Sequence, residues 1–497
     1  MAVVSPSTFD AFATPPGVEA PPAAPAVQAV PTGTSEVTLR HPAASPEWVG
    51  ALCDTLHGAG PALADRDAAE IAAALGRVGE RFLDPADPLR REALELLPPT
   101  ARLSPAMAGA VLDGMATDWT GDRLAALLAA ELGDAAVLDG FVDVSAEPRA
   151  EREAASSGRR VMAVGPSLCV QIVAGSVPGV GVSALLRSLL VKGPTLLKPG
   201  RGDVVLPVLF ARGLAEADRA LAAALAVVYW PGGDGALEDA ALARADVVTA
   251  YGSDATVRDL RARAPVTARF VAYHHRVSVG VVGRGALTAA RADVTADAVA
   301  RSLALFDQRG CVSPQVVYVE EGGGRSPEEF AEALARALAE VEAALPTAPL
   351  EPGEASALHQ ARGTAELLAA SAGGRVIHGG AAAWTVLVEP PAGAATPSDP
   401  PGATLPPALT AGRVARVRPL EAAESLPGLL APLAGHLQTV GFAGLGERLE
   451  EVARALARVG AARVVPFANV PFPPPWWHHD GGGPLTDLVR WTDLEPE

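Results

Sequence analysis

Between Val161 and Val282, short β-rich runs alternate with helical runs. The β-rich runs include LCVQIVAG, ALAVVYWPGG and DVVTAYGS, and helical stretches such as PGVGVSALLRSLLVKG separate them. This alternation predicts βαβ units and a parallel sheet. The loops AGSVPG, KPGRGD, WPGGDG and YGSDA would then share the carboxyl edge of that sheet, where such folds bind ligands. A nucleotide is the expected ligand, although the usual GxGxxG turn is missing.

The uncharged stretch from Val161 to Leu186 has 26 residues and is long enough to span a bilayer. Pro166, Gln171 and Pro178 interrupt it, together with several glycines. A strand of a parallel sheet that is covered on both faces has the same continuous apolar character. We therefore interpret this stretch as a strand, a tight turn and the start of a helix.

Composition limits the class of protein. The chain has 497 residues, of which 49% are hydrophobic and 20% charged, so it can bury a large core and form more than one domain. Its net charge is -17 and its basic residues are scattered, which argues against a nucleic-acid partner. The three cysteines form no CxxC pair, and the amino terminus has no secretory pattern. We expect a cytoplasmic protein that does not insert into a membrane.

Shifts in composition and periodicity divide the chain into six segments. The first is rich in Pro and Ala, the second has helical periodicity, and the third is charged. The fourth to sixth carry the two α/β regions and the tail, and a Pro/Gly-rich surface loop over 390–407 interrupts the fifth. The predicted segments are a disordered leader (1–45), a helical subdomain (46–134), an arm (135–160), a nucleotide-binding domain (161–282), a second α/β domain (283–459) and a return segment (460–497).

Cys311 is the main candidate for covalent chemistry. It lies in the loop DQRGC between a predicted helix and a predicted strand, with Arg309 and Gly310 before it. A thiol becomes a nucleophile when nearby positive charge lowers its pKa, and Arg309 is a possible source of that charge. A neighbouring glycine lets a substrate carbonyl approach the backbone. A buried, inert cysteine is the alternative, and the residues alone leave both open.

The segment FDQRGCVSPQVVYVEE resembles the DQxxCxSPQ motif of the LuxC-type acyl-CoA reductases, a branch of the aldehyde dehydrogenase superfamily. The YGS turn resembles the superfamily's GS loop, and WWHHDGGGPLTDLVRW resembles the family's WxHDGxxxL ending. The resemblance covers roughly residues 130 to 497. It implies an aldehyde dehydrogenase-like α/β fold with a Rossmann-like nucleotide-binding domain, a catalytic α/β domain and an oligomerisation arm.

The resemblance also implies a reaction. Cys311 would attack a fatty acyl thioester, hold the acyl group, and release an aldehyde after hydride transfer from NADPH. The Cys311 backbone N–H is the expected first donor to the developing oxyanion. Ser176 is the expected second donor, because AGSVPG aligns with the family's GNVP-type turn, where an asparagine usually stands. A serine is shorter, so the alternative is that Ser176 only caps the helix that follows.

Four residues are expected to bind the cofactor. Lys198, in LLKPG, resembles the superfamily's ribose-binding KP segment, and Arg201 would add a contact that favours a 2′-phosphate. Gly252 and Ser253 resemble the turn that approaches the pyrophosphate. Only two of the 40 basic residues are lysines, Lys192 and Lys198, so both are candidates for a specific role.

The histidines carry less weight. Hydrolytic aldehyde dehydrogenases place an activating glutamate in ELGGK, whereas this chain has AYHHRVS, which disfavours an aldehyde-to-acid oxidase. We expect His275 to be structural. We predict no metal site at His274/His275 or at His478/His479, because adjacent residues on an extended chain point to opposite faces. We expect Trp476 and Trp477 to cover an acyl tunnel or to pack as core.

Two rival functions remain at this stage. One is a coenzyme-A-acylating dehydrogenase of short aldehydes, which chain-length preference would separate from a fatty acyl reductase. The other is a catalytically silent subunit that binds an acyl carrier. The serine at position 176, where the family usually has an asparagine, suggests this alternative. The sequence also leaves the donor open between coenzyme A and an acyl carrier protein, and the resemblance implies a homo-oligomer.

Overall fold

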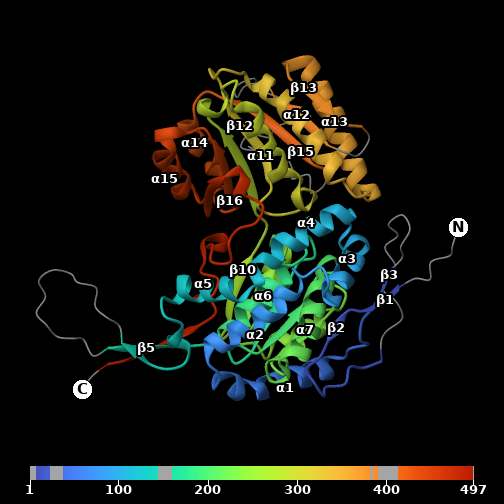
Figure 1. Ribbon diagram of the computed structural model, residues 1–497, viewed down its shortest axis with the longest axis vertical. Coiled ribbons are helices and arrows are strands. Elements are labelled where there is room, and N and C mark those ends of the chain that lie inside the picture. Colours follow the sequence, from blue (N-terminus) through green and yellow to red (C-terminus); the bar gives the residue numbers. More distant parts are fainter. Residues whose placement is uncertain (1–6, 23–36, 144–158, 381–383, 390–411, 496–497) are drawn as a thin grey trace, which may run out of the picture. The chain divides into compact units, whose positions relative to one another are not determined.

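The computed structural model describes residues 7–22, 37–143, 159–380, 384–389 and 412–495 (Figure 1). The chain forms two compact units. The first comprises Met1–Ala101, Leu112–His274 and Pro474–Glu497, and the second comprises Arg102–Val111 and His275–Pro473. Within the described ranges, none of the helices combines the length and the apolar character needed to span a bilayer.

The first unit contains a six-stranded sheet whose strands are parallel except at one edge. The strands pair in the order β10-β9-β6-β7-β8-β2. Their bounds are β10 (Arg269–Tyr273), β9 (Val247–Tyr251), β6 (Cys169–Ile172), β7 (Thr195–Lys198), β8 (Leu225–Val228) and β2 (Phe12–Ala13).

This strand order contains a reversal of chain direction across the sheet. β6 pairs with β7 on one side and with β9 on the other, so the chain winds outward from β6 in both directions. In open parallel sheets, ligands bind outside the carboxyl ends of the strands at such a switch point. The loops after β6 and β9 therefore flank the expected ligand crevice of the first unit.

Helices cover both faces of this sheet. α1 (Pro46–Ala64), α9 (Gly235–Leu242) and α10 (Asp254–Arg263) share one apolar cluster with the strands. On the other face, the buried Gln171 of β6 donates to the backbone carbonyl of Ala184 in α6 (Val180–Leu190) at 2.9 Å. The remaining α/β helices of this unit are α7 (Val205–Ala217) and α8 (Arg219–Ala222).

The helical pattern predicted over 46–134 corresponds to five helices. Side chains cap the amino ends of α1 and α2. The Ser45 side chain accepts from the backbone of α1, and the Asp67 side chain accepts from the backbone of α2. The helices after α1 are α2 (Ala68–Arg81), α3 (Pro88–Ala101), α4 (Pro105–Ala116) and α5 (Gly121–Leu132).

The predicted leader over 1–45 differs from the structure in its described parts. β2 adds an antiparallel edge strand to β8, and β1 (Ser7–Asp10) pairs with β3 (Val37–Arg40). Phe9 and Ala11 are buried. The prediction of disorder was wrong for 7–22 and 37–45, because the proline-rich composition concealed short runs that form strands: β2 pairs with the edge of an existing sheet, and β1 and β3 pair with each other.

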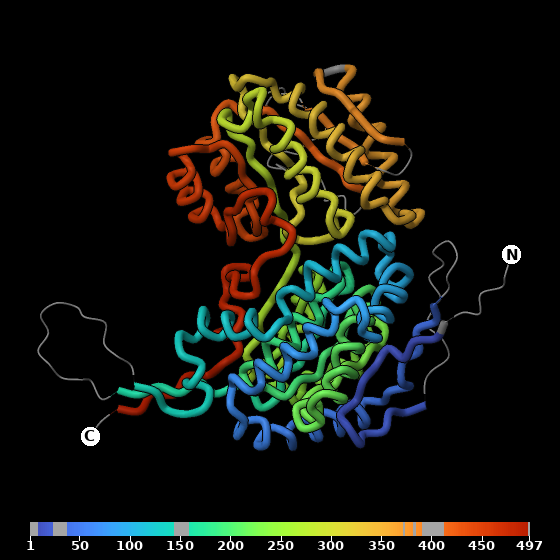
Figure 2. Tube along the Cα trace, in the orientation of Figure 1, coloured from blue at the N-terminus to red at the C-terminus, as the bar shows by residue number. Residues whose placement is uncertain are grey.

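A small antiparallel sheet forms an arm in the first unit. Its order is β18-β5-β4, with β18 (Arg490–Leu494), β5 (Arg160–Val164) and β4 (Val142–Asp143). In the tube view, the red carboxyl-terminal segment runs beside the blue-green β5 (Figure 2). The predicted arm over 135–160 thus corresponds in part to β4 and the start of β5, and the tail supplies its third strand.

The second unit contains a seven-stranded sheet that is parallel except for β13. Its order is β13-β14-β15-β12-β11-β16-β17. The strands are β13 (Arg375–His378), β14 (Thr385–Val388), β15 (Val414–Leu420), β12 (Pro314–Glu320), β11 (Val277–Val282), β16 (Leu437–Ala443) and β17 (Arg463–Pro466).

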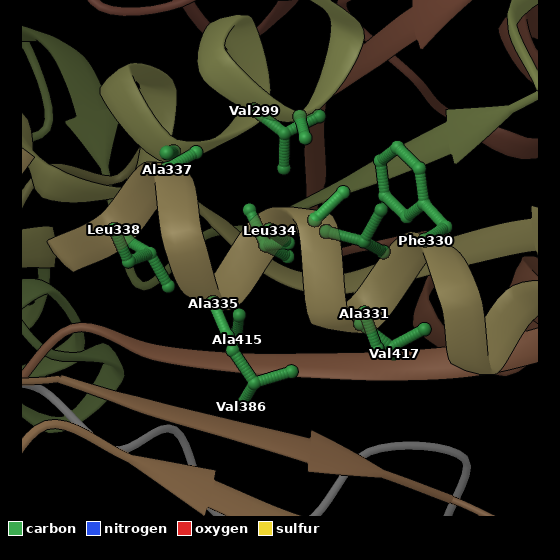
Figure 3. Packing of buried hydrophobic residues seen from close by; sticks show 14 of the residues in the cluster. Val299, Phe330, Ala331, Leu334, Ala335, Ala337, Leu338, Val386, Ala415 and Val417 are labelled. Carbon is green, nitrogen blue, oxygen red and sulfur yellow. The ribbon is translucent and has the colours of Figure 1, made fainter. Parts of the chain in front are cut away.

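Both faces of this sheet are buried. The residues of β12 are therefore apolar on both faces of the strand. Val317 and Val319 pack toward α11 (Ala292–Ala304) and α12 (Pro327–Ala344), where Figure 3 shows Phe330 and Leu334. Successive strand residues point to opposite faces, so Tyr318 packs toward the other cluster. That cluster includes α14 (Leu426–Leu430) and α15 (Leu449–Val459), and α13 (Pro352–Ala372) packs against β13 and β14.

Candidate functional site

Cys311 lies in the second unit, between the short 3-10 helix η5 (Leu305–Gln308) and β12. Its side chain is exposed, whereas Cys53 and Cys169 are buried. Burial raises the pKa of the Cys53 and Cys169 thiols to about 12 each. Of the three thiols, Cys311 is therefore the one that a substrate can reach.

The backbone of Cys311 is fixed to the sheet. The hydroxyl of Ser278, in β11, donates to the Cys311 carbonyl oxygen at 2.6 Å. The same hydroxyl accepts from the backbone N–H of Thr439 in β16 at 3.2 Å. A turn closes directly behind the cysteine, where the Ser313 N–H donates to the Gly310 carbonyl at 3.0 Å. Two strands thus position the thiol-bearing residue through one buried hydroxyl.

Three left-handed residues precede the cysteine loop. Phe306, Asp307 and Gln308 have φ values of 59°, 49° and 62°. A left-handed conformation costs an L-residue roughly 1–2 kcal/mol, and such residues usually occur singly. A run of three therefore requires strong tertiary contacts.

Asp307 is held by a buried ion pair. Its Oδ1 accepts from Arg413 Nε at 3.1 Å and from Arg413 Nη2 at 2.7 Å. Both side chains are fully buried. Burial raises the pKa of Asp307, and the Arg413 guanidinium opposes that rise. Arg413 also donates to Glu342 at 2.8 Å.

Gln308 uses both ends of its buried side-chain amide. Nε2 donates to the carbonyls of Pro314 at 2.9 Å and Val414 at 2.8 Å. Oε1 accepts from the Val414 N–H at 2.6 Å. Pro314 is the first residue of β12 and Val414 the first of β15, so this amide connects the loop to two neighbouring strands. Residues 309–313, with Cys311 at the centre, lie between Gln308 and its bonded partner Pro314.

Arg309, which the sequence suggested as a source of charge near the thiol, has other partners. Its Nη1 donates to the Arg102 carbonyl at 2.9 Å, and its Nη2 lies 3.6 Å from Glu354. Burial, followed by the neighbouring Arg102, lowers the pKa of Arg309. Its charge is thus shared with the carboxylate at the start of α13.

Ser176 lies in the loop after β6 and is exposed. The alternative prediction, that it caps the following helix, was wrong. Gly179 is the N-cap of α6, and the buried carboxylate of Asp203 accepts from the N–H groups of Gly179 and Gly181, each at 2.6 Å. Sequence reasoning missed this role of Asp203, which is 24 residues away from Gly179. An exposed hydroxyl on this loop is available to a ligand at the switch point.

Lys198 ends β7 and is buried. Its Nζ lies 5.9 Å from the centroid of the Tyr229 ring, which follows β8. Burial lowers the pKa of Lys198, and the negative charge of Glu238 opposes this effect. Arg201 is half-buried in the following turn. The sequence offered no signal for Tyr229 and Glu238, because their proximity depends on the pairing of adjacent strands.

Lys192 has a structural explanation. Its Nζ lies 2.6 Å from Asp139 Oδ1 and donates to the Ala64 carbonyl at the end of α1 at 3.0 Å. It therefore ties the loop before β7 to the helical subdomain. Its survival among arginines does not mark a cofactor contact.

Gly252 and Ser253 form the turn between β9 and α10. The Ser253 hydroxyl accepts from the Thr256 N–H at 3.2 Å and caps the helix. A side chain at Gly252 would approach Thr256 to 3.2 Å, so glycine suits this tight turn. The helix amino terminus faces the switch point, where backbone N–H groups and the helix dipole favour an anion.

The tail adds a column of stacked rings to the first unit. His479 stacks on Tyr273 at 4.4 Å between centroids and on Trp477 at 4.6 Å, and Tyr273 stacks on Tyr251 at 4.3 Å. Trp476 lies under the Arg123 guanidinium at 4.3 Å. Tyr251 and Tyr273 end β9 and β10, so the tail packs at the carboxyl edge of the sheet.

In the second unit, the His275 carbonyl lies 3.0 Å from His436 Nδ1.

Comparison with known proteins gives the family and the fold. A family model described as "Acyl-CoA reductase (LuxC)" matches residues 63–491. A long-chain acyl-protein thioester reductase from Photorhabdus laumondii subsp. laumondii is 28% identical over 169 residues, which cover 33% of this chain and 34% of the relative. A long-chain acyl-protein thioester reductase 2 from Photobacterium leiognathi is 28% identical over 182 residues, which cover 36% of each chain. The match thus spans about a third of the length of these relatives.

The solved structures that resemble this chain include several aldehyde dehydrogenases. Aldehyde dehydrogenase 21 from Physcomitrella patens gives a TM-score of 0.73 at 15% identity, over 99% of this chain and 98% of that one. An NADP-dependent glyceraldehyde-3-phosphate dehydrogenase from Bacillus halodurans C-125 gives 0.71 at 14% identity, over 95% of each chain. The predicted aldehyde dehydrogenase-like α/β fold is confirmed.

Proposed function

Because the chain belongs to the LuxC acyl-CoA reductase family, we propose that it is an oxidoreductase that reduces fatty acyl thioesters to aldehydes through Cys311. The observation that carries the proposal is the exposed Cys311 on a loop whose backbone is held by buried side chains on both sides. Buried structural cysteines, such as Cys53 and Cys169, lack this exposure.

In the first step, the Cys311 thiolate, formed when the thiol gives its proton to solvent, attacks the thioester carbonyl carbon. The bond to the donor sulfur breaks, and the donor leaves as a thiolate that takes a proton from solvent. One thioester replaces another, so little free energy separates the two sides of this step. The oxyanion that forms needs donors, and the Cys311 backbone N–H is the first candidate. The exposed Ser176 hydroxyl is the second.

The residues at the carboxyl edge of the first sheet fit a nicotinamide dinucleotide. Lys198 and Arg201 provide positive charge beside the switch point, and the capped amino terminus of α10 with Gly252 and Ser253 suits a pyrophosphate. NADPH would supply a hydride to the acyl carbon. Cys311 then leaves as a thiolate when its bond to that carbon breaks, and the aldehyde is released.

Two features bear on the partners. The names of the curated relatives specify acyl-protein thioesters, so a protein-bound acyl group is a donor to test beside acyl-CoA. We also propose a homo-oligomer that uses the arm, because β18 is exposed throughout and carries Trp491 and Leu494 at 42% and 37% exposure. Size measurement of the Trp491→Glu variant tests that assembly.

The direct test is intact-protein mass spectrometry after mixing with a long-chain acyl-CoA or an acylated carrier protein, with and without NADPH. We expect an acyl adduct that maps to the Cys311 peptide, is absent from Cys311→Ala, and disappears with aldehyde release when NADPH is added. An adduct that persists in Cys311→Ala would refute the assignment. A short-chain aldehyde dehydrogenase would instead acylate best with short donors, and a silent subunit would form no adduct.

A further inference from the structure

We propose that Asp307 and Gln308 are positioning residues that set the attack geometry of Cys311 by holding three consecutive left-handed residues in place. This inference rests on the proposed role of Cys311 as the acyl nucleophile. It assigns to these two side chains a task in acyl transfer that neither performs by touching substrate.

The backbone before Cys311 is strained. Phe306, Asp307 and Gln308 are all left-handed, and none is glycine. Glycine would adopt this conformation without steric penalty, and the chain uses it at other left-handed positions, such as Gly179. Side chains at 307 and 308 are thus retained despite the strain. Such strain persists only where surrounding contacts over-determine the conformation, and it clusters at functional loops.

Buried contacts hold Asp307 and Gln308 in this conformation. Asp307 meets Arg413 in a pair with no exposed surface on either side chain, and Arg413 is itself left-handed, with φ of 47°. Gln308 satisfies its amide on the first residues of two neighbouring strands, Pro314 and Val414. The anchors of the run are therefore buried strand ends, which cannot shift without disturbing the sheet.

Cys311 lies within the segment that these contacts hold. Gln308 and its bonded partner Pro314 close the segment on both sides of the cysteine, and Ser278 holds the Cys311 carbonyl from a third direction. The thiol therefore has few backbone freedoms left. A displacement of about 1 Å at a reacting group lowers rates on the order of 100-fold. We expect the geometry-sensitive acyl transfer to depend on this clamp more than the general reactivity of the thiol does.

The experiment compares two reactions of the same sulfur. In Gln308→Ala, Gln308→Glu and Asp307→Asn, we would measure the single-turnover rate of acylation by long-chain acyl-CoA and the rate of alkylation by iodoacetamide across pH. Iodoacetamide is small and needs no bound orientation. Gln308→Glu keeps an acceptor for the Val414 N–H but sets a buried carboxylate against the carbonyl oxygens of Pro314 and Val414, so it tests the two donated bonds.

We expect acylation to fall about 100-fold in Gln308→Ala and at least as much in Gln308→Glu. The pH midpoint and plateau of alkylation should change less than threefold. Val452→Ala is the matched control, because Val452 is a buried residue of α15 in the same unit. Its apolar side chain forms none of the hydrogen bonds that hold the cysteine loop. It should lower the unfolding temperature and leave both rates within about threefold.

Acylation of Gln308→Ala within about threefold of wild type would overturn the proposal. Equal losses of acylation and alkylation would also overturn it, because they indicate a structural role. If the wild-type protein itself forms no adduct at Cys311, the proposed function fails first and the positioning role fails with it. The Glu342→Gln variant neutralises the outer partner of Arg413, which also accepts from Thr347, and should keep acylation within about tenfold of wild type.

Discussion

The hydroxyl of Ser278 donates a 2.6 Å hydrogen bond to the carbonyl oxygen of Cys311, although 33 residues separate them in the chain. Ser278 is fully buried in β11, next to β12. The bond fixes the carbonyl of Cys311, the proposed nucleophile, and limits rotation of the loop. It connects a sheet position to a residue whose side chain is exposed.

The Ser278→Ala variant should therefore lower the acylation rate about tenfold, since it loosens the Cys311 peptide and leaves the buried Thr439 N–H without its acceptor. Stopped-flow or rapid-quench acylation would measure the change. Ser302→Ala is the matched control, because Ser302 is a buried serine of α11 whose hydroxyl donates to Val299 in its own helix. An unchanged rate in Ser278→Ala would show that this bond does not position the loop.

Thiol labelling should select Cys311. Burial raises the pKa of Cys53 and Cys169 to about 12 each, so at pH 8 both are protonated as well as inaccessible. We expect one alkyl group per folded chain at pH 8, on the peptide containing Cys311, and three after unfolding. Peptide mapping by mass spectrometry measures this pattern. Cys311→Ser should take up no label when folded, and label on Cys53 or Cys169 in the folded protein would contradict the prediction.

Glu320 should make stability depend on acid pH. Its buried carboxylate accepts from the backbone of Arg284 and Ala423 and from Arg448. Burial alone would raise its pKa, but these donors outweigh burial and hold the pKa at about 2, below the ordinary 4.5. Because the folded pKa is lowered, this stabilisation is present above pH 4.5 and is lost as pH falls toward 2.

The Glu320→Gln variant should accordingly lower the free energy of unfolding at pH 7 by about 3 kcal/mol, since it removes the buried carboxylate that pairs with Arg448 and leaves that guanidinium beside the more exposed Glu424. Denaturant titrations at pH 7 and pH 3 measure this, and the difference from wild type should shrink at pH 3. Glu450→Gln, at an exposed pair with Arg454, should change stability by less than about 1 kcal/mol. A difference that stays constant with pH would contradict the prediction.

Lys198 and Arg201 should affect cofactor use differently. Lys198→Ala removes a buried ammonium and should weaken binding of NADPH and NADH alike, by about tenfold or more. Arg201→Ser should weaken NADPH about tenfold and leave NADH within about threefold, because only the former carries a 2′-phosphate. Fluorescence titration of each cofactor measures both. If Arg201→Ser weakens the two equally, Arg201 does not recognise the 2′-phosphate.

Local sequence patterns were sufficient to predict several features. Alternating apolar runs predicted the parallel sheets, because a strand covered on both faces must be apolar on both, as Val317 and Tyr318 illustrate. The motif around Cys311 predicted the family, and the model match over residues 63–491 confirmed it. Helical periodicity predicted a helical segment over 46–134, where the structure has five helices.

Other features required the folded chain, because they join residues that are remote in sequence. The partner of Asp307 is Arg413, 106 residues away, and the groups near Lys198 come from the next strand and its following helix. Local propensity does not encode such distances. It also missed the edge strand β2, whose pairing with β8 depends on an available sheet edge.

The sequence by itself thus determined the class of fold and the family, and it named Cys311 as the candidate nucleophile, since each of these depends on residue types at short spacing. The tertiary structure decided which side chains hold that nucleophile, because Ser278, Asp307 and Gln308 act through buried hydrogen bonds to strand ends and neighbouring strands. Those bonds exist only after distant strands have paired and water has been excluded from around them.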